Sequence, residues 1–239
     1  MSSTPHHPAA FLTTRWSVVL AGASSPPQER RAALEDLARA YWYPLYAFAR
    51  RHGLGADEAA DQTQAFFALL LERNDFAKAD PARGRFRAFL LTAFKHHLSN
   101  ERARARAAKR GGGRAPVSLD AREAETRFRN EPADEETPER LYERAWTREL
   151  LARTFARLRA EQDGIGRARL FDCLRPALAA EDDAPRMAAV AQELALTENA
   201  VKVAAHRLRK RFGELLREEV AGTLTDPAEV ETELRGLLN

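Results

Sequence analysis

The stretch ENAVKVAAHRLRKRF, Glu198–Phe212, decides how the C-terminal part of the chain folds. It contains five lysines and arginines and, after Glu198, no acid. On a helix of 3.6 residues per turn, Val201, Leu208 and Phe212 fall on one apolar face. Polar and basic side chains surround the opposite face. The stretch is therefore predicted to be an amphipathic helix with one buried seam and one basic outward surface.

A shorter helix is predicted directly upstream, over Met187–Ala195, where Val190, Ala191 and Leu194 form a small apolar face. Thr197 is placed to cap the longer helix, because its hydroxyl can accept a hydrogen bond from an N-terminal amide. A short helix, a tight turn and a longer basic helix form the helix-turn-helix pattern, whose second helix enters the DNA major groove. A solvated surface helix is the plain alternative, and the missing acids favour DNA contact.

The rest of the 239-residue chain follows the helical period almost throughout, and no alternating strand pattern stands out. We therefore expect an all-α protein made of two small helical domains. A kink or a break is expected near Pro44, because proline removes a backbone hydrogen bond. Helices are expected over Gln28–His52, Ala56–Arg73, Phe86–Arg110, Pro138–Glu161, Arg167–Ala180, Met187–Ala195, Glu198–Val220 and after Pro227.

The two helical blocks are separated by a segment of different composition. Ala115–Arg140 has more acids than bases and is interrupted by Pro116, Pro132 and Pro138, which is typical of a linker. Thr137 followed by proline is a good start for the next helix. The predicted division is an N-terminal extension over 1–27, a first domain over 28–114, an acidic linker over 115–139, a second domain ending in the helix-turn-helix over 140–220, and a tail helix over 221–239.

The most basic segment is Arg83–Arg114, with ten lysines and arginines against one acid. Three phenylalanines are interleaved with them, and aromatic faces beside cations suit unstacked bases as well as phosphates. Two of the three are expected in the core. Phe86, between Arg85 and Arg87 at the edge of a predicted loop, is the best candidate for an exposed aromatic residue.

The helix predicted over Ala56–Arg73 begins with Asp57, Glu58 and Asp61. Acids in a first turn match the helix dipole, and this alone can explain them. An acidic face beside a basic one also suits a protein partner that carries basic residues. Both explanations stand at this point.

Several other classes of protein are disfavoured. A single cysteine, Cys173, rules out an internal disulfide and suits a reducing cytosol. No apolar run approaches a membrane span, and the N-terminus lacks the order of a signal peptide, so a cytoplasmic protein without membrane partners is expected. An all-α enzyme or a metal site is the weakest alternative, because the adjacent His96 and His97 point about 100° apart on a helix. No cofactor is expected.

Four segments, taken together, resemble the extracytoplasmic-function sigma factors of the sigma-70 family. YPLYAFARR resembles the start of the first conserved domain, and ADEAADQTQAFFALLL the helix that docks on the polymerase clamp helices. RFRAFLLTAFKHHLSNERARAR resembles the promoter-melting segment, and VAQELALTENAVKVAAHRLRKR the C-terminal helix-turn-helix. They lie in the order of the family. TTRWSVVL resembles a subgroup with an extended N-terminus, where Trp16 would pack on the first domain or bind a regulator.

The resemblance implies a non-enzymatic RNA polymerase subunit. Its first domain would bind the minus-ten element and the melted nontemplate strand, and its second would read the minus-thirty-five duplex. The implied polymerase contacts are Asp57, Glu58, Asp61, Gln62 and Phe66. The implied melting-segment contacts are Arg85, Phe86, Arg87, Lys95, His96, Ser99 and Asn100. The implied helix-turn-helix contacts are Glu198, Asn199, Lys202, Val203, His206, Arg207 and Lys210. The turn carries Ala195 where the family commonly has glycine.

The implied partners are core RNA polymerase and promoter DNA, both duplex and melted, with an anti-sigma factor or a kinase as a further candidate. Phe86→Ala is expected to impair promoter opening more than duplex binding. Thr63, among the docking acids, is a candidate phosphorylation site, with an ordinary helical threonine as the alternative. A helix-turn-helix regulator acting without polymerase is the alternative function. It leaves the acidic helix and the basic segment without a role.

Overall fold

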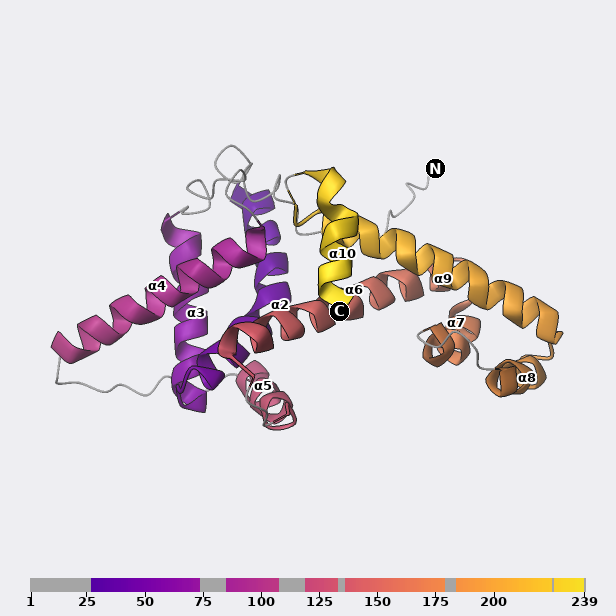
Figure 1. The fold of residues 1–239 in the computed structure, drawn as a ribbon, viewed down its shortest axis with the longest axis horizontal. Helices are drawn as coiled ribbons and strands as arrows, with labels where there is room; N and C mark the ends of the chain where they lie inside the picture. The colour runs from indigo at the N-terminus through magenta and orange to yellow at the C-terminus, as the bar shows by residue number, and fades with distance from the viewer. Residues whose placement is uncertain are drawn as a thin grey trace, which may run out of the picture. The chain divides into compact units, whose positions relative to one another are not determined.

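A computed structural model describes residues 27–73, 85–107, 119–132, 136–178, 184–224 and 226–238. Every regular element in these ranges is helical, which confirms the all-α expectation. The N-terminal segment, with Trp16, lies outside them. The helices are α2 (Pro27–Arg51), α3 (Ala56–Arg73), α4 (Phe86–Ala107), α5 (Leu119–Arg129), α6 (Pro138–Gly164), α7 (Ala168–Leu174), η3 (Arg175–Leu178), α8 (Ala184–Glu193), α9 (Glu198–Ala221), η4 (Pro227–Glu229) and α10 (Val230–Leu238) (Figure 1).

Most helices begin and end where local sequence signals place them. The amide of Arg140 donates to Oγ1 of Thr137 at 3.3 Å, so Thr137 caps α6. Gly53 follows α2 with φ of 98°, a left-handed conformation that glycine adopts without a Cβ penalty. α2 continues through Pro44, so the break considered there does not occur.

The chain forms two compact units whose boundary differs from the one expected. The described residues up to Glu149 and from Val220 onward form unit 1, and Leu150–Glu219 form unit 2. The described residues of the expected linker, 119–132 and 136–139, therefore lie within unit 1. The boundary falls inside α6 and near the end of α9, because these long helices each contribute to both units.

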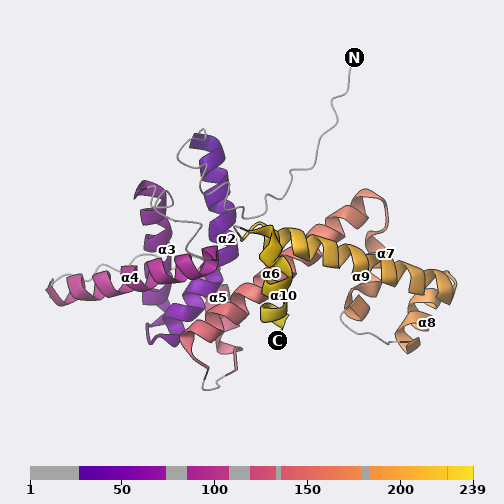
Figure 2. The same cartoon turned by 45° about the horizontal axis from the view of Figure 1, so that its top comes forward.

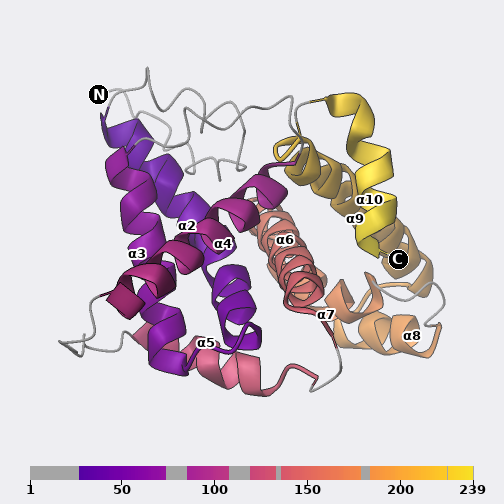
Figure 3. The same cartoon turned by 60° about the vertical axis from the view of Figure 1, so that its left-hand side comes forward.

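The core of unit 1 is rich in aromatic residues. Tyr41 and Phe48 of α2 are fully buried. Phe94 of α4 lies edge-on to Phe48, with 6.1 Å between ring centroids, and to Phe66 of α3, with 5.1 Å. These contacts fix α4 where it crosses α2 and α3 (Figure 3).

The main error of the sequence-based division is α5, which forms inside the expected linker. Glu131, just after α5, is 7% exposed and accepts hydrogen bonds from Tyr43 of α2 and from Arg144 and Arg148 of α6. Glu125 accepts hydrogen bonds from Tyr46 and Arg50 of α2. The acids that gave the segment its linker composition are thus ion-pair partners of neighbouring helices.

The Glu125 contacts also alter its acidity. Burial alone would raise the pKa of the carboxyl group, but hydrogen bonds from Arg50, Tyr46 and Arg129 outweigh burial and lower the pKa to about 2. Glu125 is therefore ionised over the whole physiological pH range, and its ion pair with Arg50 joins α5 to α2.

Unit 2 has a separate apolar core. Leu158 of α6, Phe171 of α7, Val190 of α8, and Val201 and Leu208 of α9 belong to one buried cluster. α7 and α8 lie beside the first half of α9 in this unit (Figure 2). The core thus holds the N-terminal part of α9 on its apolar side and leaves the other side exposed.

The tail helix expected after Pro227 is present as η4 and α10, but it is not a separate appendage. α10 belongs to unit 1, where Val230 and Leu234 are each 8% exposed and Glu233 is 1% exposed. The chain therefore returns to unit 1 after the helix-turn-helix.

Candidate nucleic-acid interface

α8, the turn 194–197 and α9 follow one another as a short helix, a tight turn and a longer helix, in the order that the sequence predicts. The amide of Leu196 donates to the carbonyl of Ala191 at 2.9 Å, which closes the turn. The amide of Ala200 donates to Oγ1 of Thr197 at 3.2 Å, which confirms the predicted cap of α9. Ala195 has φ of 52°, a left-handed conformation that explains why glycine is favoured in such turns.

The two faces of α9 are those that its period predicts. Val201, Ala205 and Leu208 are at most 5% exposed and belong to the core of unit 2. Phe212 packs on Phe155 of α6, with 4.4 Å between ring centroids. The residues expected to face DNA are all exposed: Glu198, Asn199, Lys202, Val203, His206, Arg207 and Lys210.

Fewer cations lie on the outward face of α9 than its composition indicates. Arg211 donates to both carboxylate oxygens of Glu161, at 2.7 and 2.9 Å, and to Glu214 at 3.1 Å. The hydrogen bonds that Arg211 donates to Glu161 are the largest cause of its raised pKa. Arg211 therefore stabilises the pairing of α6 with α9, and the cations on the outward face are Lys202, Arg207 and Lys210.

The middle of α4 carries a second polar outward surface, in unit 1. Lys95, His96, Ser99 and Asn100 are exposed, as predicted for the melting segment. Lys95 is engaged within the unit, because its Nζ lies 2.6 Å from a carboxylate oxygen of Glu139. Arg102 and Arg104 extend the exposed surface toward the end of α4. Arg83, Lys109, Arg110 and Arg114 lie outside the described residues.

The expectation for Phe86 is wrong. Phe86 is 1% exposed, and its ring lies edge-on to Tyr41 at a centroid distance of 5.5 Å. It is the first residue of α4, and Phe86, Leu90 and Phe94 recur at four-residue steps along one buried face. This period was available in the sequence. The two flanking arginines favour an exposed residue, whereas the period favours a buried one.

Arg87 is also misassigned as a surface DNA contact. It is 4% exposed and its Nε donates to Glu143 of α6 at 2.5 Å. Its guanidinium group lies 4.6 Å from the ring of Trp146, and its Nη1 donates to Glu233 of α10. Arg85 is exposed, as predicted, with its Nε 2.8 Å from the other oxygen of Glu233. Neither Glu143 nor Glu233 was a candidate residue.

The acidic face of α3 is only partly as expected. Asp57, Glu58 and Asp61 are exposed and Gln62 is half-buried. Phe66 is 2% exposed, inside the aromatic core, so it is not a surface contact. Thr63 is fully buried, and its hydroxyl donates to the carbonyl of Ala59 at 2.7 Å. The buried position contradicts its use as an accessible phosphorylation site in this fold.

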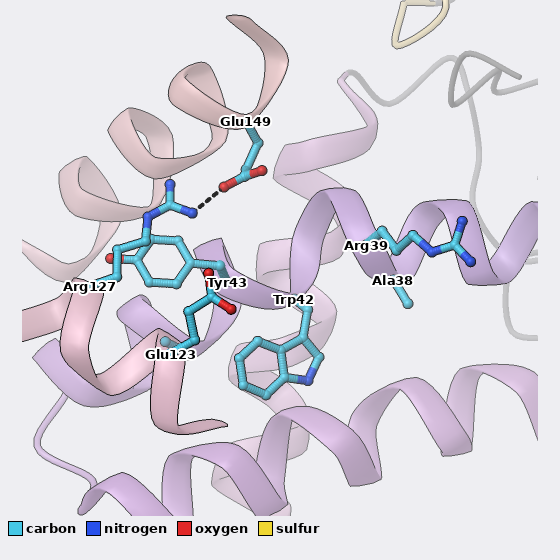
Figure 4. Close-up of a pocket in the computed structure, with 8 residues that line it drawn as sticks. Ala38, Arg39, Trp42, Tyr43, Glu123, Arg127 and Glu149 are labelled. Carbon is cyan, nitrogen blue, oxygen red and sulfur yellow. Dashed lines mark hydrogen bonds and ion pairs between the residues drawn. The ribbon is translucent and has the colours of Figure 1, made fainter. Parts of the chain in front are cut away.

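A recess of about 490 Å³ lies between α2 and α5, with Glu149 of α6 at its edge. Arg127 lies 3.7 Å from the ring centroid of Tyr43 and pairs with Glu149, as Figure 4 shows. The ring of Trp42, which also lines the recess, is stacked on Tyr46 at 5.3 Å. The charges of Arg127 and Glu149 are therefore already matched to each other.

The described part of the chain lacks the features of a metal site and of a membrane span. It contains no group of three or more histidines, cysteines or carboxylates placed to hold a metal ion. Within the same residues, no helix has both the length and the apolar character that a membrane span requires. His97, next to the exposed His96, is half-buried, and burial lowers its pKa.

Comparisons with protein-family models, with curated proteins and with solved structures each found no match.

Proposed function

We propose that this chain is an RNA polymerase sigma factor of the extracytoplasmic-function type, a cytoplasmic protein that directs transcription initiation. The observation that carries the proposal is the pair of exposed polar surfaces on two helices in different units. One is the outward face of α9 and the other is the outward face of α4. A chain that reads a duplex and also holds a melted strand needs two such surfaces.

The α9 surface has the chemistry of duplex readout. Asn199, in the first turn, can pair with the N6 and N7 edge of adenine, and Glu198 can accept from the N4 amine of cytosine. Val203, 41% exposed among polar neighbours, can contact a thymine methyl group. Lys202 and Lys210 would bind phosphates on either side, which positions the helix without specifying sequence.

The α4 surface suits a single strand. Asn100 and Ser99 offer hydrogen bonds to unpaired base edges, and Arg102 and Arg104 offer phosphate contacts. The acids of α3 would repel a phosphate backbone, so they support contact with a basic protein surface instead. Core RNA polymerase is the partner that the proposal assigns to Asp57, Glu58 and Asp61.

Co-purification with core RNA polymerase, followed by mapping of transcription start sites after overexpression, tests the proposal. The expected result is a stable complex and a set of start sites that share paired upstream motifs. Failure to bind core polymerase, with duplex binding retained, would favour a helix-turn-helix regulator instead. Asp61→Lys should reduce polymerase binding, and Glu123→Lys, exposed on α5, is the matched charge-reversal control.

A further inference from the structure

The start of α4 is covered by α10, and one buried carboxylate joins the two helices. Glu233 is 1% exposed although it belongs to a short terminal helix. Its Oε1 accepts from Arg87, and its Oε2 lies 2.8 Å from Nε of Arg85. A buried carboxylate is stable only when its charge is matched, and here two arginines at the start of the proposed melting segment provide the match.

Arg87 does not depend on α10 for its position. Glu143 and the ring of Trp146, both on α6, hold its guanidinium group. The hydroxyl of Tyr142 donates to the carbonyl of Arg87 at 3.0 Å, which fixes the backbone as well. α6 thus holds Arg87 in place without Glu233, and Arg87 together with the neighbouring Arg85 would present net positive charge to any anion replacing Glu233.

The position of Glu233 has the geometry of a phosphate contact. A carboxylate and a phosphodiester each present two anionic oxygens, and guanidinium groups bind both with charge-assisted hydrogen bonds. Arg85 has 43% of its side chain exposed, so an anion can approach it from solvent. A strand bound along α4 would bring its phosphates to this end of the helix.

α10 is also suited to detach. It has nine residues, and an isolated helix of that length is marginal in water. It is the last helix that the structure describes, and it adds two buried apolar residues, Val230 and Leu234, to unit 1. The aromatic core formed by α2, α3 and α4 does not include it.

We propose that α10 is an intramolecular cover of the melting segment, in which Glu233 competes with DNA phosphates for Arg85 and Arg87. The inference rests on the proposed function, because it assigns α4 to the single strand. Only the fraction of molecules with α10 detached presents both arginines, so the apparent single-strand affinity is reduced by that fraction.

The test uses the full chain and a fluorescent 20-nucleotide single-stranded DNA of mixed sequence, with dissociation constants measured over a range of salt concentrations. Glu233→Gln removes the charge and keeps the shape. Glu229→Gln is the matched control, because Glu229 is exposed in the turn just before α10 and the change in net charge is the same.

Glu233→Gln is expected to bind the strand at least about fivefold more tightly than the wild type and to steepen the salt dependence by about 0.7 to 1.4, one or two added phosphate contacts. The control is expected to stay within about twofold of the wild type. Equal affinities for the three proteins, or no measurable single-strand binding by any of them, would contradict the proposal that α10 covers the melting segment.

Hydrogen exchange of the wild type gives a second readout that needs no variant. Excess single strand should speed exchange of the α10 amides while it slows exchange in α4. Protection of α4 with unchanged α10 would overturn the inference even if Glu233→Gln failed to fold. Binding of the wild type to core polymerase separates the two proposals. If the wild type does not bind core polymerase, the sigma function is refuted. If it binds but exchange of the α10 amides does not change, only the proposal that α10 covers the melting segment is refuted.

Discussion

α9 and the start of α4 both present arginines or lysines, but the two regions engage their charge differently. On α9, Lys202, Arg207 and Lys210 are exposed along a face opposite the core. At the start of α4, Arg87 is buried against carboxylates that lie 56 and 146 residues further along the chain. The cations of α9 are therefore exposed to an incoming anionic partner, whereas Arg87 at the start of α4 is already paired with distant carboxylates.

The largest expected effect is on Phe86. If this residue is part of the core, Phe86→Ala should lower the free energy of unfolding by about 3–5 kcal/mol, the usual loss for a buried phenylalanine. Val203→Ala, on the exposed face of α9, should change it by less than about 0.5 kcal/mol. Urea unfolding of both variants measures the difference. Similar small losses in both would place Phe86 back at the surface.

The carboxylates of unit 1 should make its stability depend on pH. The pKa of Glu125 is about 2 in the fold against 4.5 for the ordinary group, so its contribution is complete above pH 4.5 and declines as the pH falls toward 2. Between pH 6 and pH 3 the wild type should lose about 2 kcal/mol that Glu125→Gln does not lose. Unfolding free energies at the two pH values measure this, and identical losses would count against the Glu125 contacts.

Substitutions of two exposed lysines and one paired arginine test which cations of α9 contact DNA. Lys202→Ala and Lys210→Ala should each weaken duplex binding about equally on all sequences and reduce the salt slope by about 1. Arg211→Ala is the control, because its guanidinium group is held by Glu161 and Glu214. A reduced slope for Arg211→Ala would mean that this ion pair opens to bind DNA.

The smallest effect concerns the turn before α9. Ala195 has φ of 52°, which costs a residue with a Cβ about 1–2 kcal/mol. Ala195→Gly should raise the unfolding free energy of unit 2 by roughly 0.5–1 kcal/mol, since the extra chain entropy of glycine offsets part of the relief. Thermal unfolding checks the sign. A destabilised variant would show that the turn is not strained at this residue.

Local signals predicted much of the fold and of the α9 surface. The period of Val201, Leu208 and Phe212, the Thr197 cap and the Thr137 cap each involve residues within about three turns of one another. Such signals do not depend on the rest of the chain, so the starts of α6 and α9 and the exposed face of α9 follow from them.

The errors at α5 and at Arg87 share one physical cause, which is pairing over long distances. The acids and prolines of Ala115–Arg140 predict a linker, whereas Glu125 and Glu131 accept hydrogen bonds from Tyr43, Tyr46 and Arg50, over 70 residues earlier. Arg87 is buried through Glu233 of α10 in the same way. Composition gives the number of charges in a segment, but it does not show which distant residue pairs with each of them.

Site-specific crosslinking in a complex of the chain, core RNA polymerase and a mapped promoter tests the central claim most directly. A photoreactive residue at position 203 of α9 should crosslink to duplex DNA upstream, and one at position 100 of α4 should crosslink to the melted nontemplate strand. Crosslinks from both positions to the same duplex segment, or a crosslink from position 203 alone, would contradict the assignment of two separate DNA surfaces.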